Sequence, residues 1–213
     1  MRRLQDFPYH SQRNNKYNPS GACNVTSIAM CLNYHGVDPV PEKQLEDELY
    51  QYMIDNKKSR HSGWHLAWAA ENFPKHVGSD VVIKDVFKEN GTLDELKQAI
   101  AEGNPCVVHG FFTKFGHIVA ISGYDDKGVF IEDPWGEWHS WGYDNSPGTG
   151  QYHLSWATFN RLVSPESPAN PRHIFLHVIS ATKVVSAPVE EEVEIPLNVT
   201  PLKKSRKNFK NAA

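Results

Sequence analysis

One cysteine of this chain has surroundings that suit nucleophilic catalysis. Cys23 follows a turn-like segment, residues 18–21, and precedes apolar residues at helical spacing, so we expect it at the start of a helix. The unpaired N–H groups and the dipole at a helix start lower the pKa of a thiol. The resulting thiolate can attack a carbonyl carbon, although a free cysteine is also commonly a small buried apolar residue.

A cysteine nucleophile needs a base and an acceptor that orients the base, and His117 and Asp133 fit these roles. His117 opens one apolar segment, and Asp133 directly follows the next. A hairpin turn over residues 125–127 would bring the start of the first strand beside the end of the second. We therefore predict that Asp133 binds one imidazole nitrogen and that the other faces Cys23. The alternative is a surface histidine and an ordinary turn aspartate before a proline.

Acyl transfer also needs donors for the developing oxyanion. Gln12 can supply a side-chain N–H, and the backbone N–H of Cys23 can supply a second. The other two cysteines, Cys31 and Cys106, fall inside a predicted helix and a predicted buried strand, where we interpret them as packing residues. With three cysteines in all, a disulfide framework is not expected.

The elements that must position these residues change in type along the chain. Apolar periodicity predicts a helix over about 22–34, a second after Pro41, a third that ends at Pro74, and a fourth that begins with the capping box of Thr92 and Glu95. Segments rich in β-branched and aromatic residues predict an antiparallel meander, interrupted by a short helix near 155–162. The predicted strands are 81–87, 105–112, 117–124, 128–132 and 173–179.

This order predicts an α+β fold in which helices, including the one that begins at Cys23, pack on an antiparallel sheet. We expect one domain over residues 1–180. Residues 181–213 contain prolines, an acidic cluster and then a basic one, which indicates a flexible tail or an arm that docks on a protein partner.

Charge and hydropathy exclude several classes of partner. Lys and Arg total 22 and Asp and Glu total 25, so a net charge of −3 argues against nucleic acid. An apolar run of about 18 residues is lacking, so we expect no membrane insertion. An apolar signal region is also lacking, so we expect a chain that is cytoplasmic as made and reaches a cell wall or a virion by another route.

Four motifs in order resemble the papain-like cysteine peptidases, specifically the bacteriocin-leader (double-glycine) peptidases and their stand-alone relatives. The resemblance covers residues 5–162. It implies a papain-like fold and peptidase activity without a metal or cofactor, with Cys23 as nucleophile, His117 as base, Asp133 as its orienting acceptor and Gln12 as oxyanion donor. The motifs are Phe-Pro-Tyr-His-Ser-Gln (7–12), Gly-Ala-Cys-Asn-Val-Thr-Ser-Ile-Ala-Met (21–30), Gly-His-Ile-Val-Ala-Ile (116–121) and Asp-Pro-Trp-Gly (133–136). The segment Tyr-His-Leu-Ser-Trp-Ala-Thr-Phe (152–159) is also similar and extends the resemblance.

Departures from the pattern favour the stand-alone relatives, some of which belong to phages or act on cell walls. Asn24 stands where many members have glycine, the spacing from Gln12 to Cys23 is longer than in transporter-fused peptidases, and no transporter is attached. The resemblance thus implies peptidoglycan peptides as the first substrate hypothesis and a protein or leader peptide as the second. A non-catalytic structural or binding module with the same fold is the alternative from another class.

Further residues suggest a substrate groove or a metal site. Gly116 would let a substrate approach closely, and Trp135 with Trp138, Trp141 and Tyr143 could line a groove or simply pin a loop. The histidines also raise the possibility of zinc, through the pairs Cys106/His109 and His173/His177. We disfavour that interpretation because a structural zinc ion takes four ligands in compact spacing.

Overall fold

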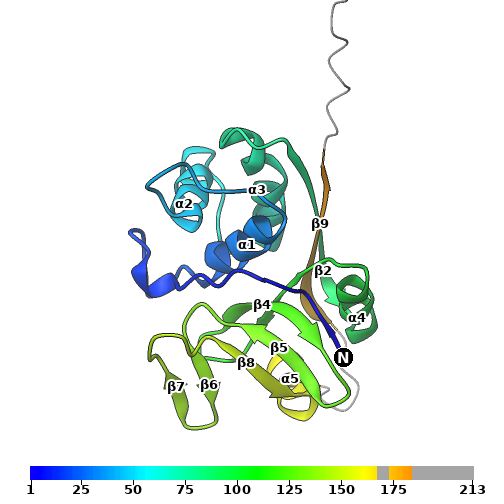
Figure 1. Cartoon of the computed structure of the whole chain (residues 1–213). Coiled ribbons are helices and arrows are strands. Elements are labelled where there is room, and N and C mark those ends of the chain that lie inside the picture. The colour runs from blue at the N-terminus through cyan, green and yellow to red at the C-terminus, as the bar shows by residue number, and fades with distance from the viewer. Residues whose placement is uncertain (167–172, 184–213) are drawn as a thin grey trace, which may run out of the picture.

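The computed structural model describes residues 1–166 and 173–183 (Figure 1). Within them, the helices are η1 (Gln12–Asn14, a 3₁₀ turn), α1 (Cys23–Tyr34), α2 (Leu45–Asp55), α3 (Gly63–His76), α4 (Leu93–Ala101) and α5 (Trp156–Val163). The strands are β1 (Arg2–Arg3), β2 (Val81–Gly91), β3 (Cys106–Gly110), β4 (His117–Tyr124), β5 (Gly128–Glu132), β6 (Glu137–His139), β7 (Gly142–Asp144), β8 (Gln151–Ser155) and β9 (Ile174–Lys183).

The strands within this part of the chain form an antiparallel seven-stranded sheet in the order β2-β9-β3-β4-β5-β8, with β1 added beside the end of β4. Strands β3, β4 and β5 follow one another as the expected meander, and β8, which was not expected as a strand, continues it. The last strand, β9, inserts between β2 and β3 and interrupts it. A separate hairpin, β6–β7, lies in the connection from β5 to β8.

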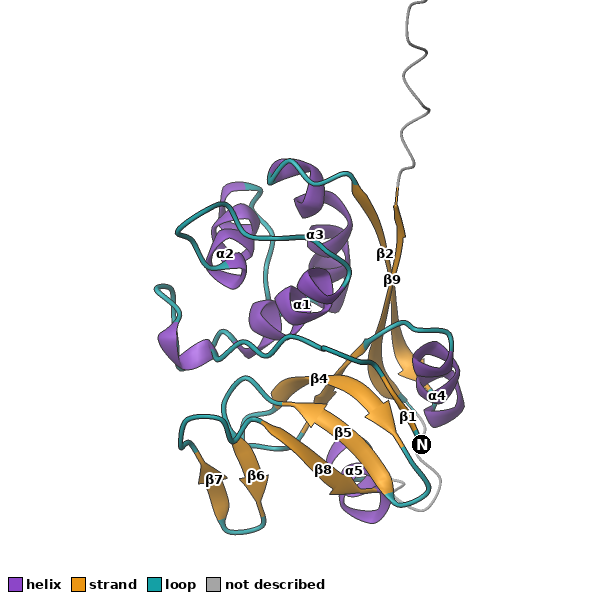
Figure 2. Cartoon of the chain, viewed as in Figure 1, coloured by secondary structure: helices purple, strands orange, loops and turns teal. Residues whose placement is uncertain are grey.

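Helices α1, α2 and α3 gather on one side of this sheet, and α5 lies on the far side against β5 and β8 (Figure 2). Helix α1 packs on β4, and its apolar face is fully buried at Val25, Ile28 and Leu32. A hydrogen bond from the Ser27 hydroxyl to the Ile118 carbonyl, 3.1 Å long, also joins the two elements. The beginning of α1 is thereby held beside the beginning of β4.

Local signals predicted most helix boundaries correctly. The capping box of Thr92 and Glu95 is present at α4, with the Thr92 side chain bonded to the Glu95 N–H and the Glu95 side chain bonded to the Thr92 N–H. The expectation that Pro74 ends the third helix was wrong, because α3 continues to His76. Pro74 lies in the last turn, where its missing N–H removes a single helical hydrogen bond.

The expected tail begins within β9, which extends to Lys183, and its residues from 184 onward lie outside the described part of the chain. No helix among the described residues has both the length and the apolar character needed to cross a membrane.

Candidate active site

A cleft of about 900 Å³ opens where the start of α1 meets the start of β4. Its lining includes Gln12, Cys23, Gly116, His117 and Trp135, which are the site residues expected from the sequence apart from Asp133. Asp133 lies behind His117 and has no exposed surface. The fold thus brings together side chains from four separate stretches of the chain.

Cys23 is the first residue of α1, and the preceding N-cap residue, Ala22, provides no side-chain cap. The thiol is partly buried. Burial acts to raise the pKa of Cys23, but the hydrogen bond and charge of His117 act against it, as do the backbone N–H groups of Ile118 and Asn24. The net result is a pKa below the usual value for a thiol.

His117 is buried at the start of β4, and its Nε2 atom donates to Oδ1 of Asp133 at 2.7 Å. This bond leaves Nδ1 as the ring nitrogen available to Cys23. Burial opposes protonation of the imidazole, but the charge and hydrogen bond of Asp133, together with Cys23, raise the pKa of His117 to about 10. The lowered thiol pKa and the raised imidazole pKa favour a thiolate–imidazolium pair.

The buried carboxylate of Asp133 accepts four hydrogen bonds from the described residues. Oδ1 receives His117 Nε2 and the backbone N–H of Trp135 at 2.9 Å. Oδ2 receives the hydroxyls of Tyr143 at 3.1 Å and Tyr152 at 3.2 Å. A buried carboxylate is stable only when such donors replace its hydration, and here every donor also fixes its orientation.

Gln12 is buried in the 3₁₀ turn η1 and lines the cleft beside Cys23. Its backbone N–H donates to the Pro134 carbonyl at 2.9 Å, which ties it to the loop that follows Asp133. Its amide Nε2 donates to the Pro19 carbonyl at 2.9 Å. An amide nitrogen has two hydrogens, so one of them remains for an oxygen in the cleft.

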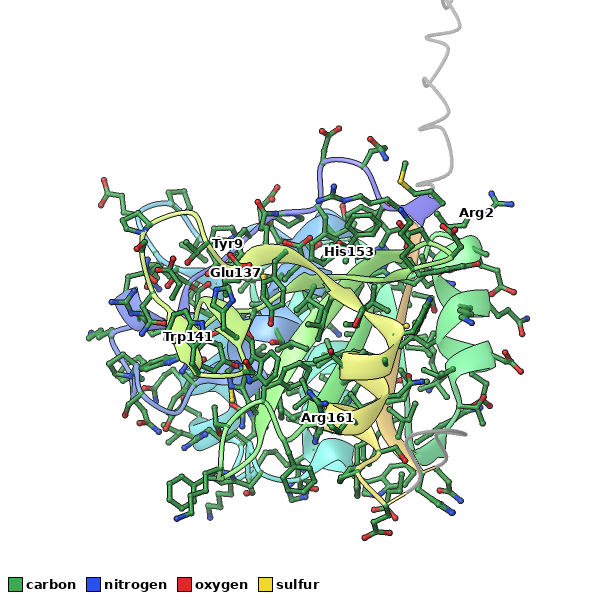
Figure 3. All side chains as sticks on the ribbon, turned by 90° about the horizontal axis from the view of Figure 1, so that it is seen from below. Arg2, Tyr9, Glu137, Trp141, His153 and Arg161 are labelled. Atoms are coloured by element: carbon green, nitrogen blue, oxygen red, sulfur yellow. The ribbon has the colours of Figure 1, made fainter. Side chains whose placement is uncertain are left out.

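Gly116 and Trp135 also line the cleft, together with His117. Gly116 has φ +85°, a left-handed conformation that glycine adopts at little cost. The other aromatic residues of the predicted groove have different positions. Trp138 packs against the core, and Trp141 is 73% exposed on the β6–β7 hairpin, where it stacks on His139 (Figure 3).

A family model described as the Peptidase_C39 like family matches residues 4–164. The chain belongs to this family. It is therefore a cysteine peptidase, a hydrolase, and the non-catalytic binding module is disfavoured. No curated protein matches the chain in sequence.

Two solved structures are similar to this C39-like peptidase. A protein from Bacillus anthracis, described as a C39-like peptidase, has a TM-score of 0.50 at 16% identity over 84% of this chain and 97% of that chain. This likeness concerns the fold and confirms the expected α+β class. A double-glycine-motif protease from an AMS/PCAT transporter, in complex with the leader peptide, has a TM-score of 0.45 at 20% identity over 84% of this chain and 99% of that chain.

The other two cysteines of this C39-like peptidase are fully buried, as expected of packing residues. Burial raises the pKa of both Cys31 and Cys106, which keeps them as unreactive thiols. The histidines weighed for zinc do not assemble with Cys106, because His177 binds Asp85 and the Cys106 thiol faces the Leu96 carbonyl. The described residues contain no group of three or more side chains that could hold a metal ion.

The contacts that Tyr143 and Tyr152 make with Asp133 were not expected from the sequence. Tyr143 was expected in an aromatic groove, and Tyr152 was given no catalytic role. A strand prediction for residues 151–155 would have helped, because β8 pairs with β5 and sets Tyr152 opposite Ile131, two residues before Asp133. The polar composition of that segment hides the strand.

Proposed function

We propose that this C39-like peptidase cleaves peptide bonds with Cys23 as nucleophile, His117 as acid and base, Asp133 as orienting acceptor and Gln12 as oxyanion donor. The observation that carries the proposal is the His117 imidazole, which bonds Asp133 through Nε2 and interacts with Cys23. The opposed pKa shifts of Cys23 and His117 support an ion pair of the kind that activates a thiol near neutral pH.

The proposed reaction begins when the Cys23 thiolate attacks the carbonyl carbon of the scissile bond. The carbonyl oxygen becomes an oxyanion, which receives N–H groups from the Gln12 side chain and the Cys23 backbone. His117 then gives its proton to the leaving amine, the carbon–nitrogen bond breaks, and an acyl group remains on sulfur. His117 next takes a proton from water, which attacks the thioester and releases the carboxylic acid and the cysteine.

For the substrate, we propose a peptide with a free carboxylate close to the scissile bond. Arg60 lines the cleft, where its guanidinium donates to the Gly21 carbonyl beside Cys23 and can also face a bound peptide. Peptidoglycan stem peptides carry free carboxylates and are therefore the first candidates, whether the protein reaches a cell wall alone or in a virion.

A leader peptide cleaved after two glycines is the second candidate. The cleft argues against it, because exposed phenylalanines also line the cavity and paired glycines have no side chains to cover them. These residues are Phe111, Phe115 and Phe175.

The test incubates wild type and the Cys23→Ala variant with purified cell walls and, separately, with a peptide that contains Gly-Gly, followed by mass spectrometry of the products. We expect new amines from cell walls with wild type and none with the variant. Equal product from both proteins would contradict the proposed nucleophile. Cleavage of the Gly-Gly peptide alone would contradict the proposed substrate but not the mechanism.

Arg60→Gln tests the carboxylate contact separately. We expect it to raise KM for peptides with a free carboxylate while leaving the reactivity of Cys23 unchanged. Arg161→Gln on α5 is the matched control, since Arg161 is exposed and absent from the cleft lining (Figure 3). Equal kinetics for both variants would contradict a role for Arg60.

A further inference from the structure

The carboxylate of Asp133 is held from three strands, and only one of them carries His117. We infer that Tyr143 and Tyr152 are positioning residues for the reaction proposed above, whose two hydroxyls fix Asp133 so that it orients and stabilises the His117 imidazolium. This inference depends on the proposed function, since it assigns the residues that act through Asp133. The two hydroxyls, from β7 and β8, surround Asp133 with polar contacts on the side that His117 does not occupy.

The two oxygens of Asp133 have separate sets of donors. Oδ1 serves His117, and Oδ2 accepts only the two tyrosine hydroxyls among the contacts of the described residues. Asp133 has no exposed surface, so water does not replace a lost donor from the outside. The hydroxyls therefore fix the rotation of the carboxylate and compensate its charge at the oxygen that His117 does not reach.

Tyr143 contacts both His117 and Asp133. Its ring meets the His117 imidazole edge to face, with centroids 6.0 Å apart and planes at 79°. Its hydroxyl meanwhile reaches Asp133. The β6–β7 hairpin thus places one side chain against both the imidazole of His117 and Oδ2 of Asp133, which limits the movement of both groups.

Tyr152 also lies near the same hairpin, since the backbone of Trp138 in β6 acts to lower the pKa of the Tyr152 hydroxyl. Burial, and then the charge of Asp133, raise the pKa of both tyrosines, so both remain protonated donors over the working pH range.

The titratable groups around Asp133 come from every element packed against it. They are His117 on β4, Cys23 on α1, which interacts with His117, Tyr143 on β7, Tyr152 on β8 and Tyr9 in the N-terminal segment. Tyr9 differs from the other two tyrosines because its hydroxyl donates to the backbone carbonyl of Asp133, at 3.0 Å, and not to the carboxylate. It therefore offers a matched control for the loss of a phenol near the same residue.

The test compares Tyr143→Phe, Tyr152→Phe and the double variant with wild type and Tyr9→Phe. The rate of Cys23 alkylation by iodoacetamide is measured from pH 4 to 10 by peptide mapping, together with kcat, KM and thermal unfolding. Without both hydroxyls, one oxygen of the buried carboxylate lacks its hydrogen-bond partners, so the carboxylate is held less firmly and stabilises the imidazolium less.

For the double variant, we expect the acid limb of Cys23 alkylation to move up by about one pH unit or more, since one hydrogen bond to a charged group is worth roughly tenfold or more in an equilibrium. We expect kcat to fall about tenfold with KM nearly unchanged, and smaller effects in each single variant. Tyr9→Phe should lower the thermal midpoint and leave the acid limb in place.

The outcomes separate this inference from the proposed function. If wild-type Cys23 is not unusually reactive at pH 6, the proposed function fails, and this inference fails with it. If wild type is reactive and the double variant keeps the wild-type acid limb, only the positioning role fails. An equal shift in Tyr9→Phe would also overturn it, because the effect would then come from general loosening of the loop. If the double variant does not fold, the acid limb of Cys23 alkylation is measured in the two single variants instead.

Discussion

The Nε2 atom of His117 lies 2.7 Å from Oδ1 of Asp133, and both side chains are buried. The bond joins the first residue of β4 to the residue after β5, across the hairpin that these strands form. It orients the ring so that Nδ1 remains for Cys23 at the start of α1. A single local pairing thus determines which nitrogen can exchange a proton with the nucleophile.

Asp133→Asn tests the charge of the orienting residue. The amide oxygen can still accept from His117, so the ring orientation is retained, but the negative charge that raises the pKa of His117 is lost. We expect kcat to fall by about 10²-fold and the alkaline limb of the pH profile to move to lower pH. Steady-state kinetics from pH 5 to 10 provide the measurement, and a profile equal to wild type would refute the role of the charge.

Gln12→Ala tests the oxyanion donor. Removal of one such donor costs roughly 10²- to 10³-fold in kcat, and we expect a loss of that size. Cys23 alkylation should keep its wild-type rate, because the ion pair with His117 does not involve Gln12. Gln98→Ala on the exposed face of α4 is the control and should change neither quantity. A kcat within twofold of wild type in Gln12→Ala would contradict the assignment.

The raised pKa of His117 predicts how stability depends on pH. In a Cys23→Ala background, the pairing of protonated His117 with Asp133 stabilises the folded protein. This stabilisation is fully present below pH 6.5, the ordinary pKa of a histidine. That contribution is lost as the pH rises through the folded-state pKa, which is about 10 when Cys23 is present.

The measurement is the difference in unfolding free energy between Cys23→Ala and Cys23→Ala with His117→Gln, taken by denaturant unfolding from pH 5 to 10. We expect a difference that is largest at pH 5 to 6 and declines steadily above pH 7. A difference that grows with pH would show that His117 is buried as the neutral imidazole.

The local part of the site could be predicted from the sequence, because a short hairpin constrains which residues meet. His117 and Asp133 are 16 residues apart, and the turn between their strands fixes their pairing. The helix start at Cys23 likewise follows from nearby apolar periodicity. The meeting of Cys23 with His117 depends on how α1 packs on β4, which periodicity does not encode. It was expected because a nucleophilic cysteine needs a base, and from the family resemblance.

The remaining parts of the fold depend on long-range pairing. Strand β9 inserts between β2 and β3, and no local pattern in residues 173–179 distinguishes that place from the end of a meander. The β6–β7 hairpin is only a few residues long, and β8 is largely polar, so neither has a clear strand signal. Tyr143 and Tyr152 reach Asp133 from these elements, and for that reason their contacts could not be predicted from the sequence.

The pH dependence of Cys23 alkylation in wild type and in His117→Ala tests the central claim most directly, because it needs no substrate. Iodoacetamide labelling with peptide mapping reports all three cysteines in one experiment. In wild type, Cys23 should react at pH 6 at least about tenfold faster than Cys31 or Cys106, whose burial raises their pKa values. In His117→Ala, burial of Cys23 is no longer opposed by the imidazolium, so labelling at pH 6 should fall more than about tenfold. Equal Cys23 labelling in both proteins, or equally slow labelling of all three cysteines in wild type, would contradict the claim that His117 activates Cys23.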